Sequence, residues 1–144
     1  MILLDTNILV CATGRKSPHH AQAKEICEAA YQGKMEACVA FQNLCEWYAV
    51  VTDPRRFEPA LSVGDAVREL EAFLAPSRLT LLTFSPGVSG RMPSLLRRSN
   101  CRGAHVFDVF LVATMLENGV ETVYTENVKD FTTFREIYAV NPFR

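Results

Sequence analysis

The chain has 144 residues, of which 49% are hydrophobic, and a formal net charge of −1. This length matches the commonest domain size, so we expect a single domain over residues 1–144. The near-neutral charge gives no overall attraction to nucleic acid. No apolar segment reaches the ~20 residues that a membrane span needs, and the N-terminus does not resemble a signal peptide. We therefore expect a cytoplasmic protein with no membrane partner.

The pattern of cysteines also favours a cytoplasmic protein. Their number is odd, and no two have the C-x-x-C spacing of a zinc or redox site. Most of them lie in apolar segments, so we expect buried free thiols, which persist in reducing surroundings. They are Cys11, Cys27, Cys38, Cys45 and Cys101.

The chain opens with a short apolar run, residues 2–4, followed at once by Asp5, Thr6 and Asn7. A run of this kind is typical of a strand buried on both faces of a parallel sheet. Ligands of such sheets bind beyond the carboxyl ends of the strands, so Asp5 is a candidate catalytic or metal-binding group. The alternative is that Asp5 or Asn7 only caps the next helix.

Helices and strands are expected to alternate after this first strand. Ser17 followed by Pro18 is a typical helix start, Gly33 is a typical helix end, and Ser62 can cap a further helix. Residues 106–116 are apolar almost all round, so we expect that helix to be central and buried. The alternation predicts a three-layer α/β/α sandwich with a mainly parallel central sheet. The predicted helices cover residues 8–12, 17–32, 42–51, 62–75, 85–100 and 106–116, and the predicted strands cover residues 2–4, 37–40, 79–84, 120–124 and 137–140.

Four acids occupy comparable places relative to these elements. Asp5 follows the first strand, Glu46 lies on the helix after the second, Asp108 begins the apolar helix, and Asp130 follows the fourth strand. Taken singly, Glu46 could be a solvated acid and Asp108 a favourable N-terminal helix residue. Grouped together, they would repel one another unless protons or a cation compensated their charge. Oxygen ligands of this kind select hard ions such as Mg²⁺.

An ordered set of short motifs runs along nearly the whole chain. It comprises Leu4-Asp5-Thr6-Asn7, His20 with Ala23, Glu46, Pro54-Arg55-Arg56-Phe57, Asp108 with Ala113, the segment 125–131, and Asn141-Pro142. In this order and spacing the chain resembles the PIN-domain ribonucleases of the VapC toxin type. The resemblance implies a PIN-like α/β fold.

The resemblance also implies roles for particular residues. The core acids would be Asp5, Glu46 and Asp108, arranged around Mg²⁺ or Mn²⁺. Many relatives carry a further acid where this chain has Asn127, and the nearest remaining acid is Asp130. Either residue could fill the fourth position. Supporting hydrogen bonds are expected from Thr6, Asn7 and Thr125, whereas His20, His19 and His105 are not expected to bind metal.

The activity implied by the resemblance is that of a metal-dependent endoribonuclease, the toxin of a type II toxin–antitoxin pair. Its partners would be RNA, a VapB-type antitoxin and a second copy of the chain in a homodimer. Cationic side chains would hold the RNA backbone, although each could equally be a solvated surface group. The candidates are Arg55, Arg56, Arg97, Arg98, Arg102 and Lys129.

Two other functions remain open from the residues. Asn127 in place of an acid allows a catalytically degenerate binding module that acts through a partner protein. A phosphatase with Asp5 as nucleophile would normally need a second aspartate at position 7, where this chain has Asn7.

Overall fold

A parallel sheet in the order β3-β2-β1-β4-β5 forms the centre of the molecule. The computed structural model describes residues 1–75 and 79–144. In register, Leu3 of β1 lies opposite Cys38 on one side and Val123 on the other. The strands are β1 (Ile2–Leu4), β2 (Ala37–Ala40), β3 (Thr80–Leu82), β4 (Thr122–Tyr124) and β5 (Tyr138–Val140).

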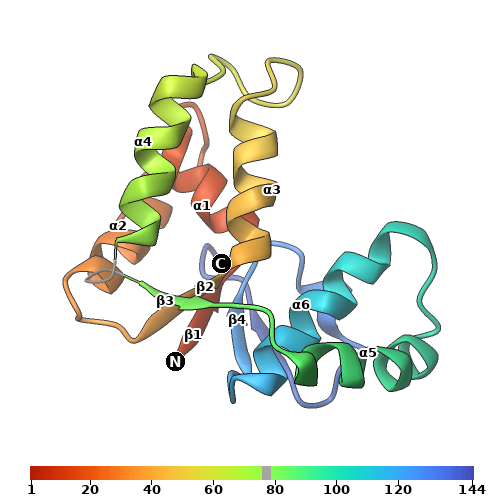
Figure 1. Ribbon diagram of the computed structural model, residues 1–144. Helices are drawn as coiled ribbons and strands as arrows, with labels where there is room; N and C mark the ends of the chain where they lie inside the picture. The colour runs from red at the N-terminus through yellow and green to blue at the C-terminus, as the bar shows by residue number, and fades with distance from the viewer. Residues whose placement is uncertain (76–78) are drawn as a thin grey trace.

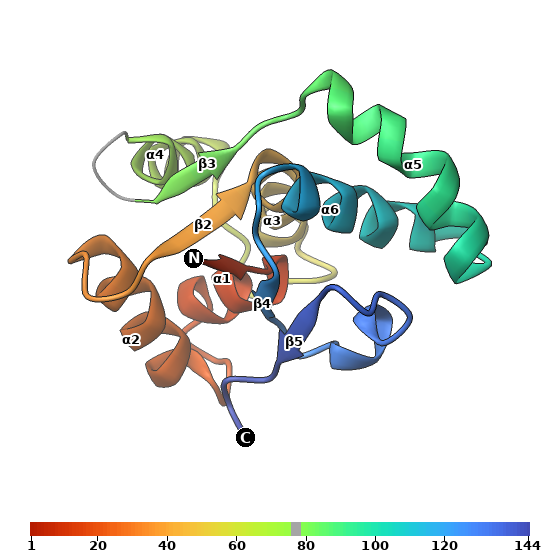
Figure 2. The ribbon, with the colours of Figure 1, turned by 90° about the horizontal axis from the view of Figure 1, so that it is seen from below.

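Helices cover both faces of this sheet, so the predicted three-layer sandwich is confirmed (Figures 1 and 2). Four helices pack on one face: α1 (Thr6–Thr13), α2 (His20–Tyr31), α3 (Phe41–Val51) and α4 (Val63–Leu74). The other face carries α5 (Pro86–Ser99) and α6 (Val106–Glu117), with the short 3₁₀ helices η1 (Gly103–His105) and η2 (Val128–Phe131). No helix of the described residues has the length and hydropathy needed to cross a membrane.

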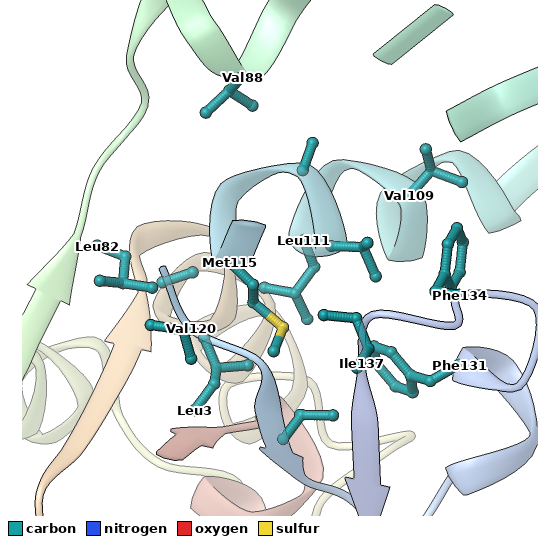
Figure 3. Packing of buried hydrophobic residues seen from close by; sticks show 14 of the residues in the cluster. Leu3, Leu82, Val88, Val109, Leu111, Met115, Val120, Phe131, Phe134 and Ile137 are labelled. Carbon is teal, nitrogen blue, oxygen red and sulfur yellow. The ribbon is translucent and has the colours of Figure 1, made fainter. Parts of the chain in front are cut away.

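The two cores arise from the alternation of side chains along the strands. Leu4 points into the core beneath α1–α4, which includes the fully buried Trp47. Its neighbour Leu3 points into the other core, where Met115 of α6 and Phe131 of η2 pack against the sheet (Figure 3). Both faces of β1 are therefore buried, as its apolar sequence predicts.

The strand order creates a crevice next to β1. From β1 the chain moves outward through β2 and β3, then returns to β4 and β5 on the other side of β1. Connections that leave in opposite directions open a crevice at the carboxyl ends of such strands. Asp5 follows β1 at this point, and Thr125 follows β4.

Helix boundaries agree with the predicted ranges except at α2. That helix begins at His20 rather than Ser17, because the Ser17 hydroxyl accepts a hydrogen bond from the backbone N–H of His19 and closes a separate turn. Gly33 ends the helix as predicted, with a φ of +68° that favours glycine. Ser62 caps α4 by accepting from the backbone N–H of Asp65.

Two predictions about buried faces were wrong. On α3, Cys45 was expected to be a buried thiol, yet it is exposed, while Asn43 and Trp47 are fully buried. On α6, Phe107 is 58% exposed, so the helix is not buried all round. Asn43 is buried because its side chain donates a hydrogen bond to the buried carboxylate of Asp5. A pattern of hydrophobic residues does not reveal such a contact.

Candidate active site

Asp5 lies at the centre of the site, where β1 ends and α1 begins. Its side chain is 9% exposed and accepts four hydrogen bonds, two on each oxygen. The donors are Thr6 N at 2.7 Å and Asn43 Nδ2 at 3.3 Å to Oδ1, and Asn7 Nδ2 at 2.9 Å and Thr125 Oγ1 at 2.6 Å to Oδ2. Asp5 therefore caps α1 and also lies at the predicted site, so the two interpretations of its position are compatible.

Glu46 reaches toward Asp5 from the neighbouring helix. Its Oε2 accepts a hydrogen bond of 2.9 Å from Thr6 Oγ1, and its Oε1 accepts one of 2.7 Å from Gln42 Nε2. The Thr6 hydroxyl in turn accepts from Asn43 Nδ2. These bonds hold Glu46 in the site, so it is not a freely solvated acid.

Asp108 approaches from the opposite helical layer. It lies in the first turn of α6, and its Oδ2 is 2.9 Å from Nδ1 of His105. Asp108 and Asp130 both line a cleft of about 300 Å³. Asp108 is also close enough to Asp5, Glu46 and Asp130 for their charges to interact.

The charges of these acids are coupled. Burial raises the pKa of Asp5, the nearby Glu46 and Asp108 raise it further, and hydrogen bonds from Thr125 and Thr6 oppose the shift. Burial likewise raises the pKa of Asp108. The negative charges of Asp130 and Glu46 raise this pKa further, whereas the hydrogen bond with His105 lowers it. The neighbouring negative charges therefore make Asp5 and Asp108 harder to ionise.

The supporting residues form a hydrogen-bonded network around Asp5. Asn7 donates to Thr125 Oγ1 at 3.0 Å and accepts from the backbone N–H of Glu126 at 3.1 Å. Thr125 is fully buried and also accepts from the backbone N–H of Asn127. Asn127 itself is exposed. This network joins the loops that follow β1 and β4.

Sequence reasoning missed three residues that touch the acids. Asn43 was placed on the polar face of its helix without a partner, yet it donates to Asp5 and Thr6. Gln42 contacts Glu46, and His105 contacts Asp108. For Asn43 a signal exists: it lies in the first turn of a helix that follows a buried strand, as Asn7 does.

The six candidate cations divide by position. Arg102 and Lys129 line the same cleft as Asp108 and Asp130. Arg55 and Arg56 lie beyond the far end of α3, in the loop before α4 (Figure 1), where Arg55 pairs with Asp53. The structure therefore does not bring these two arginines to the acids.

Two further candidate cations, and the histidines at positions 19 and 20, lie outside the acid cluster. Arg98 pairs with Glu136 at 2.7 Å, and Arg97 is exposed on the same helix. His20 contacts the backbone carbonyl of Cys11 at 3.1 Å, which agrees with the structural role predicted for it. His19 stacks on Phe143.

The acids offer oxygen donors but no ready-made cage for a cation. Within residues 1–75 and 79–144, no group of three or more His, Cys, Asp or Glu side chains is close enough to form one. Mg²⁺, however, usually takes only one or two carboxylates and keeps several waters. Over the same residues, no Lys or Arg forms an ion pair with Asp5, Glu46, Asp108 or Asp130. A hard divalent cation therefore fits both the donor set and the uncompensated charge.

Comparison with known proteins assigns the fold to a family. The PIN domain family matches residues 2–137, which is nearly the entire chain. The chain belongs to the PIN domain family. The resemblance to VapC-type PIN domains inferred from the motifs is thereby confirmed.

Relatives of this PIN domain include ribonucleases by name. Ribonuclease VapC24 of Mycobacterium tuberculosis is 30% identical over 140 residues, with 93% of this chain and 91% of the relative covered. Ribonuclease VapC48 of the same organism is 28% identical over 139 residues, with 96% and 95% covered.

Solved structures of low sequence identity share the PIN fold. The toxin VapC20 of M. tuberculosis, described as cleaving the sarcin–ricin loop, aligns with a TM-score of 0.69 at 16% identity, over 93% of this chain and 95% of that one. VapBC2 from Rickettsia felis, bound to a promoter DNA fragment, aligns with a TM-score of 0.66 at 21% identity, over 97% and 98%. VapBC-1 from Haemophilus influenzae aligns with a TM-score of 0.65 at 18% identity, over the full length of both chains.

Proposed function

We propose that this PIN domain is a metal-dependent endoribonuclease and the toxin of a type II toxin–antitoxin pair. The observation that carries the proposal is that Asp108 interacts electrostatically with Asp5, Glu46 and Asp130, while none of these acids has a Lys or Arg partner among the described residues. The names of its relatives support RNA as the substrate.

In this proposal Asp5, Glu46 and Asp108 hold Mg²⁺ or Mn²⁺. When bound, such an ion lowers the pKa of a water molecule and stabilises the charge that develops on a phosphodiester during hydrolysis. Thr6, Asn7 and Thr125 keep the carboxylates in place through the hydrogen bonds described above.

The fourth position of the site falls to Asp130 rather than Asn127. Asp130 is close enough to raise the pKa of Asp108 and lines the same cleft. Asn127 contributes its backbone N–H to Thr125, and its side chain is exposed. Asp130 thus supplies the charge that relatives place two residues after the threonine.

Arg102 and Lys129 hold the RNA backbone in this proposal, because they flank the acids along one cleft. Cations bind the phosphates of RNA without reading its sequence. Arg55 and Arg56 are too far along α3 to contact the same phosphate.

A VapB-type antitoxin and a second copy of the chain are the protein partners in this proposal. Several solved relatives of this fold are toxin–antitoxin complexes, including those of Rickettsia felis and Haemophilus influenzae. The compartment proposed is the cytoplasm, where RNA is accessible and where free cysteines such as the five in this chain remain reduced.

Cleavage of total bacterial RNA by the purified chain tests the activity, with Mn²⁺, with Mg²⁺ and with chelator. The matched inactive variant is Asp108→Asn. The Asp108 side chain is half-buried and, within residues 1–75 and 79–144, bonds only to His105, whereas four donors converge on Asp5. Discrete cuts that need the metal and disappear in the variant are expected.

The opposite result would favour the degenerate binding module suggested by Asn127. A chain that is folded and free of antitoxin, yet neither binds Mn²⁺ nor cuts RNA, would contradict the nuclease proposal. Sequencing the ends of any cut fragments would identify the RNA target.

A further inference from the structure

Gln42 connects the two helices that carry Glu46 and Asp108. Its Nε2 donates one hydrogen bond of 2.7 Å to Glu46 Oε1, four residues along α3, and a second of 2.9 Å to the backbone carbonyl of Phe107 in the first turn of α6. Since α3 and α6 belong to opposite helical layers, this side chain joins the two layers through its two hydrogen bonds.

The orientation of the Gln42 amide follows from its partners. Both groups that face Nε2 are acceptors, a carboxylate and a carbonyl, so the reversed amide would place Oε1 against two oxygens. In the observed orientation Oε1 is buried and has no hydrogen-bond partner among the described residues. The two hydrogen bonds of the Gln42 amide are therefore both made by its nitrogen, and both are made to α3 and α6.

The contacts of Gln42 determine where the Glu46 carboxylate lies. One oxygen of Glu46 is held by Thr6 from α1, and the other is held by Gln42. Because Gln42 is also bonded to the residue directly before Asp108, a shift of α6 relative to α3 would move both carboxylates together. The spacing of the two acids is therefore coupled to this one side chain.

We infer that Gln42 is a positioning residue: it holds Glu46 at the spacing from Asp108 that a shared divalent cation requires. The inference rests on the proposed function, in which both acids bind the metal. Gln42 itself offers no oxygen to the ion, since its Oε1 is shielded from solvent.

The affinity of the purified chain for Mn²⁺, measured by isothermal titration calorimetry, tests this role. Loss of a residue that orients a metal ligand typically weakens binding by about 10- to 100-fold, and we expect a loss of that order for Gln42→Leu. The matched control is Gln22→Leu on the exposed face of α2, which should leave the affinity unchanged. Gln42→Asn keeps the amide but is too short for both contacts, so it should also weaken binding and serves if the leucine variant does not fold.

A double-mutant cycle separates positioning from a general structural effect. In a Glu46→Gln background the carboxylate that Gln42 holds is already gone, so Gln42→Leu should cause no further loss of Mn²⁺ affinity. A further loss as large as in the wild-type background would overturn the inference, as would folded Gln42 variants with wild-type affinity.

The Mn²⁺ affinity of the wild-type chain distinguishes failure of the proposed function from failure of the inference about Gln42. If the wild-type chain itself binds no Mn²⁺, the metal site is absent and the inference is overturned with it. If the wild-type chain binds Mn²⁺ and both Gln42 variants bind it equally well, only the role of Gln42 is overturned.

Discussion

A buried carboxylate surrounded by neutral donors is the most costly feature of this PIN domain. Asp5 receives four hydrogen bonds, yet burial and the neighbouring acids still raise its pKa. Removing a charge from water without an opposite charge is unfavourable. The raised pKa shows that the four hydrogen bonds do not fully compensate the burial of this charge.

Asp108→Asn should stabilise the protein in the presence of chelator at pH 7. The pKa of Asp108 is raised in the folded state above its ordinary value of 3.8, mainly by burial, so the folded chain binds this proton more readily than the unfolded chain does. The ionised carboxylate then lowers stability as the pH rises through the folded-state pKa, and it has no such effect below 3.8. The melting temperature of Asp108→Asn should exceed that of wild type at pH 7. This difference should disappear in acid. A gap independent of pH would contradict this origin.

Mn²⁺ should raise the melting temperature of wild type above that of Asp108→Asn. A ligand that binds only the folded state, present at 100 times its Kd, raises the free energy of unfolding by about 2.7 kcal/mol. Wild type should gain this stability and Asp108→Asn should gain much less, since a proposed ligand is lost. Thermal melts over a series of Mn²⁺ concentrations measure both. Equal gains in the two proteins would place Asp108 outside the metal site.

Asn43→Ala should destabilise the protein although it removes a polar side chain. Asn43 is fully buried and accepts from the backbone N–H of Ala40 at 3.1 Å while donating to Asp5 and Thr6. A buried donor left unpaired costs about 1–3 kcal/mol, and urea denaturation should show a loss of that size. Asn127→Ala, at an exposed position, should change stability by less than about 0.5 kcal/mol.

Helix α6 links the site to the core. Its first turn presents Asp108 to the cleft, while Val112 and Met115 are fully buried in the core that α6 shares with the sheet and α5. Figure 3 shows Met115 pointing into this core. A helix whose middle is held by packing on two sides keeps its N-terminal residues in a defined place. The rigidity of the acid cluster therefore depends on the interior of this helix.

Met115→Ala should destabilise the fold strongly. Truncation of a buried methionine removes apolar contacts and leaves a cavity, which together cost about 2–5 kcal/mol. Val67→Ala on α4 is the comparison, because Val67 is 39% exposed and its truncation should cost less than about 0.5 kcal/mol. Urea denaturation measures both, and equal losses would show that α6 is less tightly packed than the structure indicates.

The molecule as a whole has almost no net charge, so the RNA binding proposed for it requires cations in particular places. Arg102 and Lys129 are next to the acids, while Arg55 and Arg56 lie at the other end of α3. A cleft in which cations flank acids can hold phosphates on either side of the bond to be cut. The position of a cationic side chain relative to the acids should therefore decide whether it contributes to RNA binding.

Arg102→Ala and Lys129→Ala should each weaken RNA binding in the presence of chelator. Each lost phosphate contact should lower the slope of log K against log salt concentration by about 0.7 for single-stranded RNA. Arg55→Ala is the matched control and should leave both affinity and slope unchanged, since Arg55 is exposed and paired with Asp53. Fluorescence anisotropy at several salt concentrations measures these values. An effect of Arg55→Ala equal to that of Arg102→Ala would contradict the assignment of the cleft.

Local patterns in the sequence determined the fold class and the position of Asp5. An apolar run such as residues 2–4 is typical of a strand buried on both faces of a parallel sheet, and the polar residue after it then lies at the carboxyl edge. Helix starts such as Ser62 were also predictable, because a cap depends on residues three positions apart. The order of the motifs along the chain was enough to indicate the PIN family, which the comparison confirmed.

Contacts between distant segments were decided only by the tertiary structure. Asp5 bonds to Asn43, 38 residues away, and to Thr125, 120 residues away. Hydrophobic periodicity marks apolar side chains, so it placed Cys45 inside and gave Asn43 no partner, whereas a buried polar side chain is explained only by the group it bonds to. For the same reason the sequence could not tell Arg102 from Arg55, nor show that Gln42 joins two helices: a charge or an amide acts on whatever the fold places within hydrogen-bonding distance.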